Sequence, residues 1–261
     1  MPNREDHLLA RGLAEEAGRR LLALRDRADL DDLGKAGDRE SHEFLMSALA
    51  AARPGDAILS EEGKDDPGRL TASRVWIIDP LDGTREYDEP GRTDWAVHVA
   101  LWERRIASGA EGGQPSSPGL LVAGAVGLPA QGLTLSTADP PTVPVRDPGR
   151  PLRITVSRTR PPAFVDAVAA ELGAELVPMG SAGAKVGAVI AGTVDAYMHA
   201  GGQYEWDSAA PAAVARAAGL HVSRVDGSEP EYNKLEPTLP DLVVCRPDDV
   251  KRLMTSLEAV R

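Results

Sequence analysis

The sequence predicts a layered fold of helices and mixed sheets, α+β in its first half and α/β in its second. Residues 7–27 repeat apolar side chains at helical spacing, which indicates an amphipathic helix covering a core. Residues 139–151 contain five prolines in thirteen positions, a composition typical of a crossing between two parts of a chain. Beyond that crossing, strand-like and helix-like segments alternate, as they do in layered α/β folds.

The first half is expected to contain two helices followed by strands. One face of the first helix carries Leu9, Leu13, Ala17, Leu21 and Leu24, and a second helix is predicted at residues 39–52. The strand-like runs are residues 57–59, 75–78, 95–102, 120–128 and 132–136. The stretch 103–118 is rich in Gly, Ser and Pro, and we expect it to form a mobile loop.

The second half is expected to alternate between strands and helices. The strands are predicted near residues 152–156, 174–177, 194–199, 220–225 and 242–245, and the helices near 162–172, 181–191, 208–218 and after Pro247. We therefore predict an N-terminal α+β domain at residues 1–147 and a C-terminal α/β domain at residues 148–261.

Composition and charge restrict the function. The 261 residues are 42% hydrophobic and 26% charged, as in ordinary soluble globular proteins, which excludes an intrinsically disordered chain. The net charge of −11 disfavours binding to nucleic acid, whereas a small anionic ligand held through a metal is compatible with it. The single cysteine, Cys245, excludes an intrachain disulfide. Neither a signal peptide nor a membrane span is recognisable, so we expect a cytoplasmic protein without membrane contacts.

The strongest local signal is DPLDGT at residues 79–84, directly after the run 75–78. Asp79 and Asp82 follow a strand end, where both can face one cavity, and two like charges in a partly dry site require a cation. Gly83 permits a sharp turn, after which the first amides of a helix can bind an anion. The alternative is an ordinary turn with solvated carboxylates.

Other acidic residues strengthen the cation-site interpretation. Glu61 and Glu62 follow the run 57–59 and can reach the neighbouring strand end, although at most one of them is expected to point inward. Asp207 precedes an Ala-rich helix, and Asp38 precedes the second helix. Taken alone, each of these two aspartates is better explained as a helix N-cap, but capping does not exclude a role in a site.

The candidate ligands are all oxygens, which suits Mg²⁺ or Mn²⁺ better than Zn²⁺. The five histidines show no paired metal-ligand spacing and are expected to be surface or core residues. Cys245 lies in an apolar run and is expected to be a buried small hydrophobic residue rather than a nucleophile.

Three motifs in order and spacing closely resemble the inositol monophosphatase superfamily of Mg²⁺-dependent, Li⁺-sensitive phosphomonoesterases: LSEE at 59–62, DPLDGT at 79–84 and EWDSAA at 205–210. The match spans nearly the whole chain. The resemblance implies the layered αβαβα sandwich of the inositol monophosphatase and fructose-1,6-bisphosphatase type.

Finer details are similar to the CysQ-type 3'-phosphoadenosine 5'-phosphate (PAP) phosphatases. After Thr84 the chain continues Arg-Glu-Tyr, similar to the Lys-Glu-Phe of CysQ proteins. Ser181 and Lys185 are similar to a Ser and Lys stretch of the nucleotidases. Inositol monophosphatases carry a glutamate that binds inositol hydroxyls seven residues before the position of Asp207, where this chain has Ala200.

By matching position, the resemblance implies roles for individual residues. The ligands of two or three Mg²⁺ ions, with Mn²⁺ as a substitute, would be Glu61, Asp79, the Leu81 carbonyl, Asp82 and Asp207. Thr84 and Asp38 would activate the attacking water together with Glu61. The substrate contacts would be Gly83, Thr84, Ser181, Lys185 and Asp207. The family usually has a Thr shortly before the aspartate matched to Asp38, which this chain lacks, so a mobile lid around Lys35 is an alternative for this segment.

The resemblance implies hydrolysis of the 3'-phosphate of PAP to AMP, and of 3'-phosphoadenosine 5'-phosphosulfate (PAPS), in connection with sulfate assimilation. Inositol 1-phosphate and fructose 1,6-bisphosphate are alternative substrates. A haloacid-dehalogenase-type phosphatase, which is phosphorylated on an aspartate, and a non-catalytic cation-binding protein are the rival classes. Relatives are frequently homodimers, and lithium is expected to inhibit.

Overall fold

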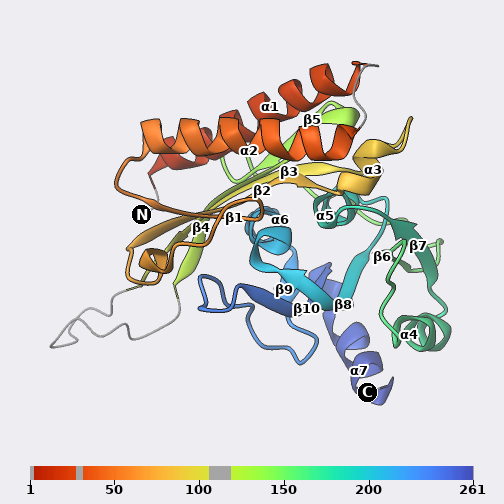
Figure 1. The fold of residues 1–261 in the computed structure, drawn as a ribbon. Coiled ribbons are helices and arrows are strands. Elements are labelled where there is room, and N and C mark those ends of the chain that lie inside the picture. Colours follow the sequence, from red (N-terminus) through yellow and green to blue (C-terminus); the bar gives the residue numbers. More distant parts are fainter. Residues whose placement is uncertain (1–2, 28–31, 106–118, 261) are drawn as a thin grey trace, which may run out of the picture.

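The computed structural model describes residues 3–27, 32–105 and 119–260. The chain folds into five layers, in which two sheets alternate with three layers of helices (Figure 1). The helices are α1 (Arg4–Arg25), α2 (Leu33–Ala52), α3 (Thr84–Asp88), α4 (Val165–Leu172), α5 (Ala182–Ile190), α6 (Glu205–Ala217) and α7 (Val250–Val260). Short 3₁₀ helices are η1 (Pro67–Leu70), η2 (Pro129–Gln131) and η3 (Pro247–Asp249).

Each sheet has five strands. The first, in the order β1-β2-β3-β4-β5, consists of β1 (Ala57–Ser60), β2 (Arg74–Asp82), β3 (Ala96–Glu103), β4 (Leu120–Leu128) and β5 (Leu133–Ser136). The second, in the order β7-β6-β8-β10-β9, consists of β6 (Arg153–Ser157), β7 (Glu175–Met179), β8 (Ala196–Tyr204), β9 (His221–Ser223) and β10 (Thr238–Cys245). Strand β1 runs parallel to β2, and β6 runs parallel to β7 and β8, while the remaining pairs are antiparallel.

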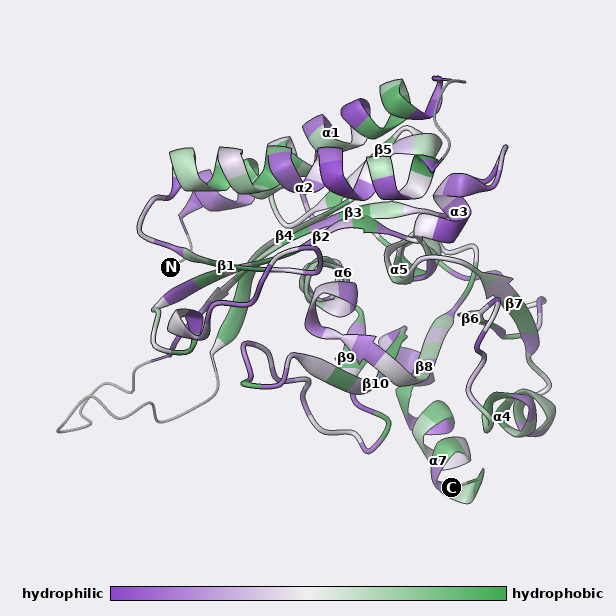
Figure 2. Ribbon diagram, viewed as in Figure 1, coloured by the Kyte–Doolittle hydropathy of each residue, from purple (hydrophilic) through white to green (hydrophobic). Residues whose placement is uncertain are grey.

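Three apolar clusters fill the spaces between these layers. Helices α1 and α2 cover the outer face of the first sheet, where residues such as Leu21, Leu45 and Trp76 are buried. Helices α5 and α6 lie between the two sheets and bury an Ala-rich surface. Helices α4 and α7 cover the far face of the second sheet. Figure 2 shows α1 alternating between hydrophobic and hydrophilic residues, as the amphipathic pattern predicts.

The expected strands and helices are present, with shifted boundaries. The polar stretch predicted as a mobile loop lies mostly at residues 106–118, outside the described residues. Helices α5 and α6 follow the proline-rich crossing in sequence but pack on the first sheet as well as on the second, so the division at residues 147 and 148 stays a prediction. Among the described helices, none combines the length and apolar character that a bilayer crossing requires.

Helix α2 begins at Leu33, six residues earlier than the predicted start at residue 39. Asp32 is its N-cap and accepts a hydrogen bond from the Lys35 amide. A Cβ on Gly34 would lie 2.6 Å from Thr84 Cγ2, and one on Gly37 would lie 2.8 Å from Tyr87 Cε1. The glycines therefore allow α2 to approach α3 closely, and Asp38 lies inside a helix rather than at its N-cap.

Candidate active site

The parallel pairing of β1 and β2 brings two acidic segments to the same edge of the first sheet. Ser60 pairs with Ile78, so Glu61, just after the end of β1, lies beside Asp79 in β2. The Glu61 amide donates to the Ile78 carbonyl at 3.4 Å. This arrangement follows from the strand order, since the carboxyl ends of neighbouring parallel strands meet at one edge.

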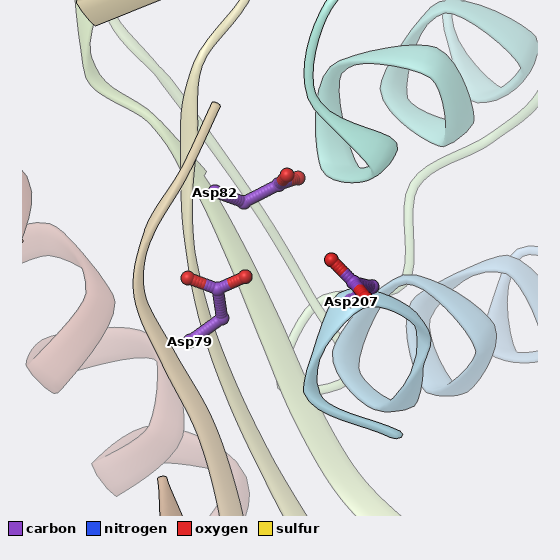
Figure 3. A group of neighbouring side chains, drawn as sticks. All are labelled: Asp79, Asp82 and Asp207. Carbon is purple, nitrogen blue, oxygen red and sulfur yellow. The ribbon is translucent and has the colours of Figure 1, made fainter. Parts of the chain in front are cut away.

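Three aspartates from two elements converge beside this edge. Asp79 and Asp82 come from β2 and Asp207 from the first turn of α6, and one carboxylate oxygen of each lies within 4.8 Å of the others (Figure 3). Asp79 and Asp82 are buried, and Asp207 is half-buried. Because the three ligand atoms are carboxylate oxygens, this group can hold a hard divalent cation.

The hydrogen bonds of these aspartates leave one buried oxygen without a donor. Asp79 Oδ1 accepts from the Leu81 amide at 3.0 Å, whereas Asp79 Oδ2 has no hydrogen-bond partner among the described residues. Asp207 Oδ2 accepts from the Tyr204 amide at 2.6 Å, as the third residue of α6, and so it is not the N-cap that its position suggested. A buried carboxylate oxygen lacking a donor is costly unless a cation occupies the site.

Asp82 is the best-supported carboxylate of the group. Its Oδ2 accepts from the Ser181 hydroxyl at 2.6 Å and from the Gly183 amide at 2.7 Å. The Nε2 atom of buried His98 lies 3.2 Å from the same oxygen, at ion-pair distance but without the alignment of a hydrogen bond. Burial opposes the charged carboxylate, but His98 and Lys185 outweigh it and lower the pKa of Asp82.

The remaining acids of the site hold their protons more tightly than usual. Burial and the charges of Glu61, Asp82 and Asp207 raise the pKa of Asp79 well above its ordinary value. Burial and Asp82 raise the pKa of Asp207 to about 6. Crowded carboxylates with raised pKa values are typical of a site that is complete only with a cation.

Glu61 lies beside the three aspartates but outside their tight group in the described residues. The side chain lines the same cavity. The residue as a whole is exposed, yet the protein around its carboxyl group, followed by the charge of Asp207, raises the pKa of Glu61 to about 7. Its adjacent neighbour Glu62 does not line this cavity.

Thr84 connects the loop after β2 with helix α2. Its hydroxyl lies 3.2 Å from the Leu81 carbonyl oxygen and 3.4 Å from Asp38 Oδ1, and it can donate to either. Burial, followed by the charge of Glu62, raises the pKa of Asp38 to about 7. Gly83, with φ of 88°, precedes α3 and lets the chain turn from the strand into this short helix.

Ser181 and Lys185 lie at the start of α5. Ser181 is the N-cap, with φ of 23°, and its hydroxyl accepts from the Ala184 amide while it donates to Asp82. The Lys185 ammonium is buried and donates to the Gly180 and Ser181 carbonyls. Burial lowers the pKa of Lys185, and Asp82 opposes this effect. Both residues line the cavity, and both have structural bonds of their own.

A cavity of about 300 Å³ lies between the acidic group and a cationic wall. The wall contains Arg85, Arg158 and Arg160 together with Lys185. Arg158 is engaged by Glu86 and Glu89, each at 2.7 Å. The side chains of Arg85 and Arg160 form no hydrogen bond or ion pair with any described residue, so both are available to an anionic ligand.

Comparison with known proteins identifies the family. The profile of the inositol monophosphatase family matches residues 9–255. The chain belongs to the inositol monophosphatase family. The sequence resemblance to this family, and the layered sandwich that it implied, are therefore confirmed.

Individual members of the inositol monophosphatase family resemble this chain to different extents. The 3'-phosphoadenosine 5'-phosphate phosphatase of Mycobacterium leprae is 52% identical over 248 residues, which cover 93% of this chain and 90% of that protein. The 3'(2'),5'-bisphosphate nucleotidase CysQ of Escherichia coli K12 is 30% identical over 217 residues, covering 78% of this chain and 81% of that protein. The crystal structure of CysQ from Bacteroides thetaiotaomicron has a TM-score of 0.74 at 24% identity and covers 94% of this chain and 98% of that chain.

Sequence reasoning missed three residues of this family member's site. His98 was expected to be an ordinary core or surface histidine, but its buried ring contacts Asp82 and pairs with the Trp206 carbonyl at 3.0 Å. Arg158 and Arg160 were not singled out, because they follow β6 in a segment without a local motif. A basic pair just after a strand end is the only sequence signal that could have suggested them.

Proposed function

We propose that this chain is a Mg²⁺-dependent phosphomonoesterase that removes the 3'-phosphate of PAP to give AMP and also acts on PAPS, in connection with sulfate assimilation. The observation that carries the proposal is the close approach of Asp79, Asp82 and Asp207, with a buried Asp79 oxygen that lacks a donor, beside a cavity that Asp82 and Asp207 line. Identity of 52% to a protein named as a PAP phosphatase supports this substrate.

The donor set fits Mg²⁺, with Mn²⁺ as a substitute, because the candidate ligand atoms are carboxylate or carbonyl oxygens. In this proposal Glu61, Asp79 and the Leu81 carbonyl hold one ion, while Asp79, Asp82 and Asp207 hold a second. Bound Mg²⁺ supplies a water of lowered pKa and neutralises the charge of the phosphate.

The chain's own residues then handle the proton and the phosphate. The Thr84 hydroxyl, donating to the Leu81 carbonyl or to Asp38, keeps its lone pairs free to accept a hydrogen bond from the attacking water. The carboxylate of Asp38, with a pKa of about 7, can hold the proton passed through Thr84. The amides of Gly83 and Thr84 contact phosphate oxygens. Hydrolysis proceeds by in-line attack of water, without a covalent enzyme intermediate.

The cationic wall supports a substrate with a second anionic group. Arg85 and Arg160 are unengaged by the described residues, and they line the same cavity as Asp82 and Asp207. A substrate that has only the transferred phosphate would leave these two arginines without an anionic partner. A bisphosphorylated nucleotide can bring one phosphate to the acidic group and the other to the arginines, so we prefer it to inositol 1-phosphate.

Phosphate release in the presence of Mg²⁺ tests the proposal. We expect kcat/KM for PAP to exceed the value for inositol 1-phosphate, which lacks a second phosphate, by at least about tenfold, the effect of one charge-assisted contact. The value for PAP is also expected to exceed that for fructose 1,6-bisphosphate. Omission of the divalent ion is expected to stop turnover. Equal kcat/KM values for all three compounds would refute the nucleotide assignment, and a phospho-aspartate trapped on Asp79 would favour the haloacid-dehalogenase class.

The remaining expectations are proposals of the same kind. We propose that the protein is cytoplasmic, forms a homodimer, and is inhibited by Li⁺ through occupation of a metal position. The division into domains at residues 1–147 and 148–261 also belongs here. Cell fractionation, sedimentation equilibrium, Li⁺ titration and limited proteolysis address these points in turn.

A further inference from the structure

Gln203 carries a buried polar atom that none of the preceding roles uses. Its side chain lines the cavity, and the residue is only 6% exposed. The Nε2 atom donates to the Tyr197 hydroxyl at 2.9 Å. The Oε1 atom is buried and has no hydrogen-bond partner among the described residues. A carboxamide fixed at one end therefore presents an unsatisfied acceptor.

A bulge in β8 directs the Gln203 side chain towards Tyr197. Ala200 pairs with Asp241 and Gln203 with Leu239, so two residues of β8 oppose one residue of β10. These two residues of β8, Gly201 and Gly202, have φ of 84° and 76°. A bulge of this kind re-aims the following side chain, and it lets Gln203 reach Tyr197, six residues earlier.

Gln203 lies beside the candidate metal group. Asp207 follows it by four residues, and both residues line the same cavity. Burial, and then the charges of Asp207 and Asp82, raise the pKa of Tyr197, so its hydroxyl lies within the field of both carboxylates. The Lys185 ammonium lies 5.3 Å from the centre of the Tyr197 ring and already donates to two carbonyls.

We propose that Gln203 is a specificity-determining residue whose Oε1 accepts a hydrogen bond from the part of the substrate that is not transferred. The donor is neutral, either a sugar hydroxyl or the amino group of the base. The inference rests on the proposed function, since it takes a nucleotide to be the substrate. A site with a buried acceptor rejects analogues that lack the donor, because the acceptor is then left unpaired.

A cycle of protein variants and substrate analogues tests this contact. The variants are Gln203→Met, which keeps the approximate size but removes the acceptor, and Gln203→Glu, which keeps an acceptor oxygen. The substrates are PAP, its 2'-deoxy analogue and inosine 3',5'-bisphosphate, which lacks the amino group. We expect Gln203→Met to lower kcat/KM for PAP by about 10- to 100-fold.

The decisive result is non-additivity. Wild type and Gln203→Met are expected to have equal kcat/KM for the analogue that lacks the contacted donor. If that analogue is the 2'-deoxy compound, the donor is the 2'-hydroxyl; if it is the inosine compound, the donor is the amino group. Gln203→Glu is expected to keep the preference for PAP over that analogue. Additive losses with both analogues, or an unchanged kcat/KM of Gln203→Met for PAP, would overturn the proposal.

Two controls separate the possible failures. Gln131 is exposed, donates to the Thr93 carbonyl and does not line the cavity, so Gln131→Leu is expected to leave all kcat/KM values unchanged. Thermal melting checks that the Gln203 variants are folded. If Gln203→Met does not fold, the preference for PAP over its analogues is compared between Gln203→Glu and wild type instead. A wild-type protein that releases no phosphate from PAP refutes the proposed function, whereas an active wild type with additive losses refutes only the role of Gln203.

Discussion

The Ser181 hydroxyl donates a hydrogen bond of 2.6 Å to Asp82 Oδ2 and thereby joins the start of α5 to the end of β2. The same hydroxyl caps α5, so Asp82 is held by a residue that is itself fixed. Burial opposes the charged form of Asp82, but the charge of His98, and then Lys185 and the Ser181 hydroxyl, outweigh burial and lower the pKa of Asp82. Burial and the neighbouring acids, by contrast, raise the pKa of Asp79. The site therefore combines a carboxyl group that favours its charged form with others whose charged form a cation can stabilise.

Replacing Asp79 is expected to abolish turnover and to stabilise the metal-free fold. In Asp79→Asn the Oδ1 atom can still accept from the Leu81 amide, but the buried charge is gone. We expect kcat to fall at least about 1,000-fold, because ligands of a catalytic metal act in the transition state. Without divalent ions, the Tm at pH 7.5 is expected to rise by several degrees. Phosphate release and thermal melting measure the two effects.

The matched control for this variant is Asp166→Asn on the exposed face of α4. It removes the same charge away from the cavity and is expected to leave kcat unchanged and to lower the Tm slightly, because an acid in the first turn of a helix stabilises that helix weakly. Near-wild-type turnover in Asp79→Asn would contradict the metal-site assignment.

The stability of the metal-free protein is expected to fall as pH rises from about 4 to 7. A carboxyl group whose pKa is raised by folding binds its proton more tightly in the native state, so the native state loses stability as pH rises through this window. The pKa values of about 6 for Asp207 and about 7 for Asp38 and Glu61 define its upper end. Urea unfolding at several pH values without divalent ions measures the trend.

Mg²⁺ binding is expected to show the opposite dependence on pH. The ligands must lose their protons, so the affinity increases as pH rises through 6 to 7. We expect the increase in Tm on adding Mg²⁺ to be larger at pH 8.0 than at pH 5.5. Equal increases at both pH values would mean that these carboxyl groups do not bind the ion.

Thr84 and Asp38 are expected to act as a unit. Thr84→Val keeps the shape of the side chain but removes the hydroxyl between the Leu81 carbonyl and Asp38, and we expect kcat to fall about 100- to 1,000-fold with little change in KM. Asp38→Asn is expected to cause a similar loss. The double variant is expected to lose little more than either single variant, and strictly additive losses would show that the two residues act separately.

Arg160 is expected to distinguish bisphosphates from monophosphates. Its side chain lines the cavity without an ion pair to any residue that the structure describes. In Arg160→Ala we expect kcat/KM for PAP to fall about tenfold or more, from the loss of one charge-assisted contact. The value for 3'-AMP, which lacks the 5'-phosphate, is expected to change little.

The control for Arg160 is Arg153→Ala, which removes a guanidinium that pairs with Glu175 away from the cavity. This variant is expected to leave both substrates unaffected. A similar loss for PAP and 3'-AMP in Arg160→Ala would assign Arg160 to the transferred phosphate or to the fold instead.

Much of the fold and part of the site could be predicted from consecutive residues. Most of each strand of the first sheet is an apolar run bounded by polar or turn residues, and in β2 Asp79 directly follows such a run and Asp82 ends the strand. The start of α2 could not be predicted in this way. Gly34 and Gly37 weaken a helix locally, and their use depends on contact with Thr84 and Tyr87, which are about 50 residues away in sequence.

The sequence by itself determined the order of the elements and the acidic character of the strand ends, because local patterns of apolar and turn residues encode both. Only the tertiary structure decided which distant side chains join the acidic residues in the site. His98 reaches Asp82 through strand pairing, and Arg160 and Gln203 reach the cavity through a segment after β6 and a bulge in β8. These contacts form between segments that are far apart in the chain, so no pattern of neighbouring residues predicts them.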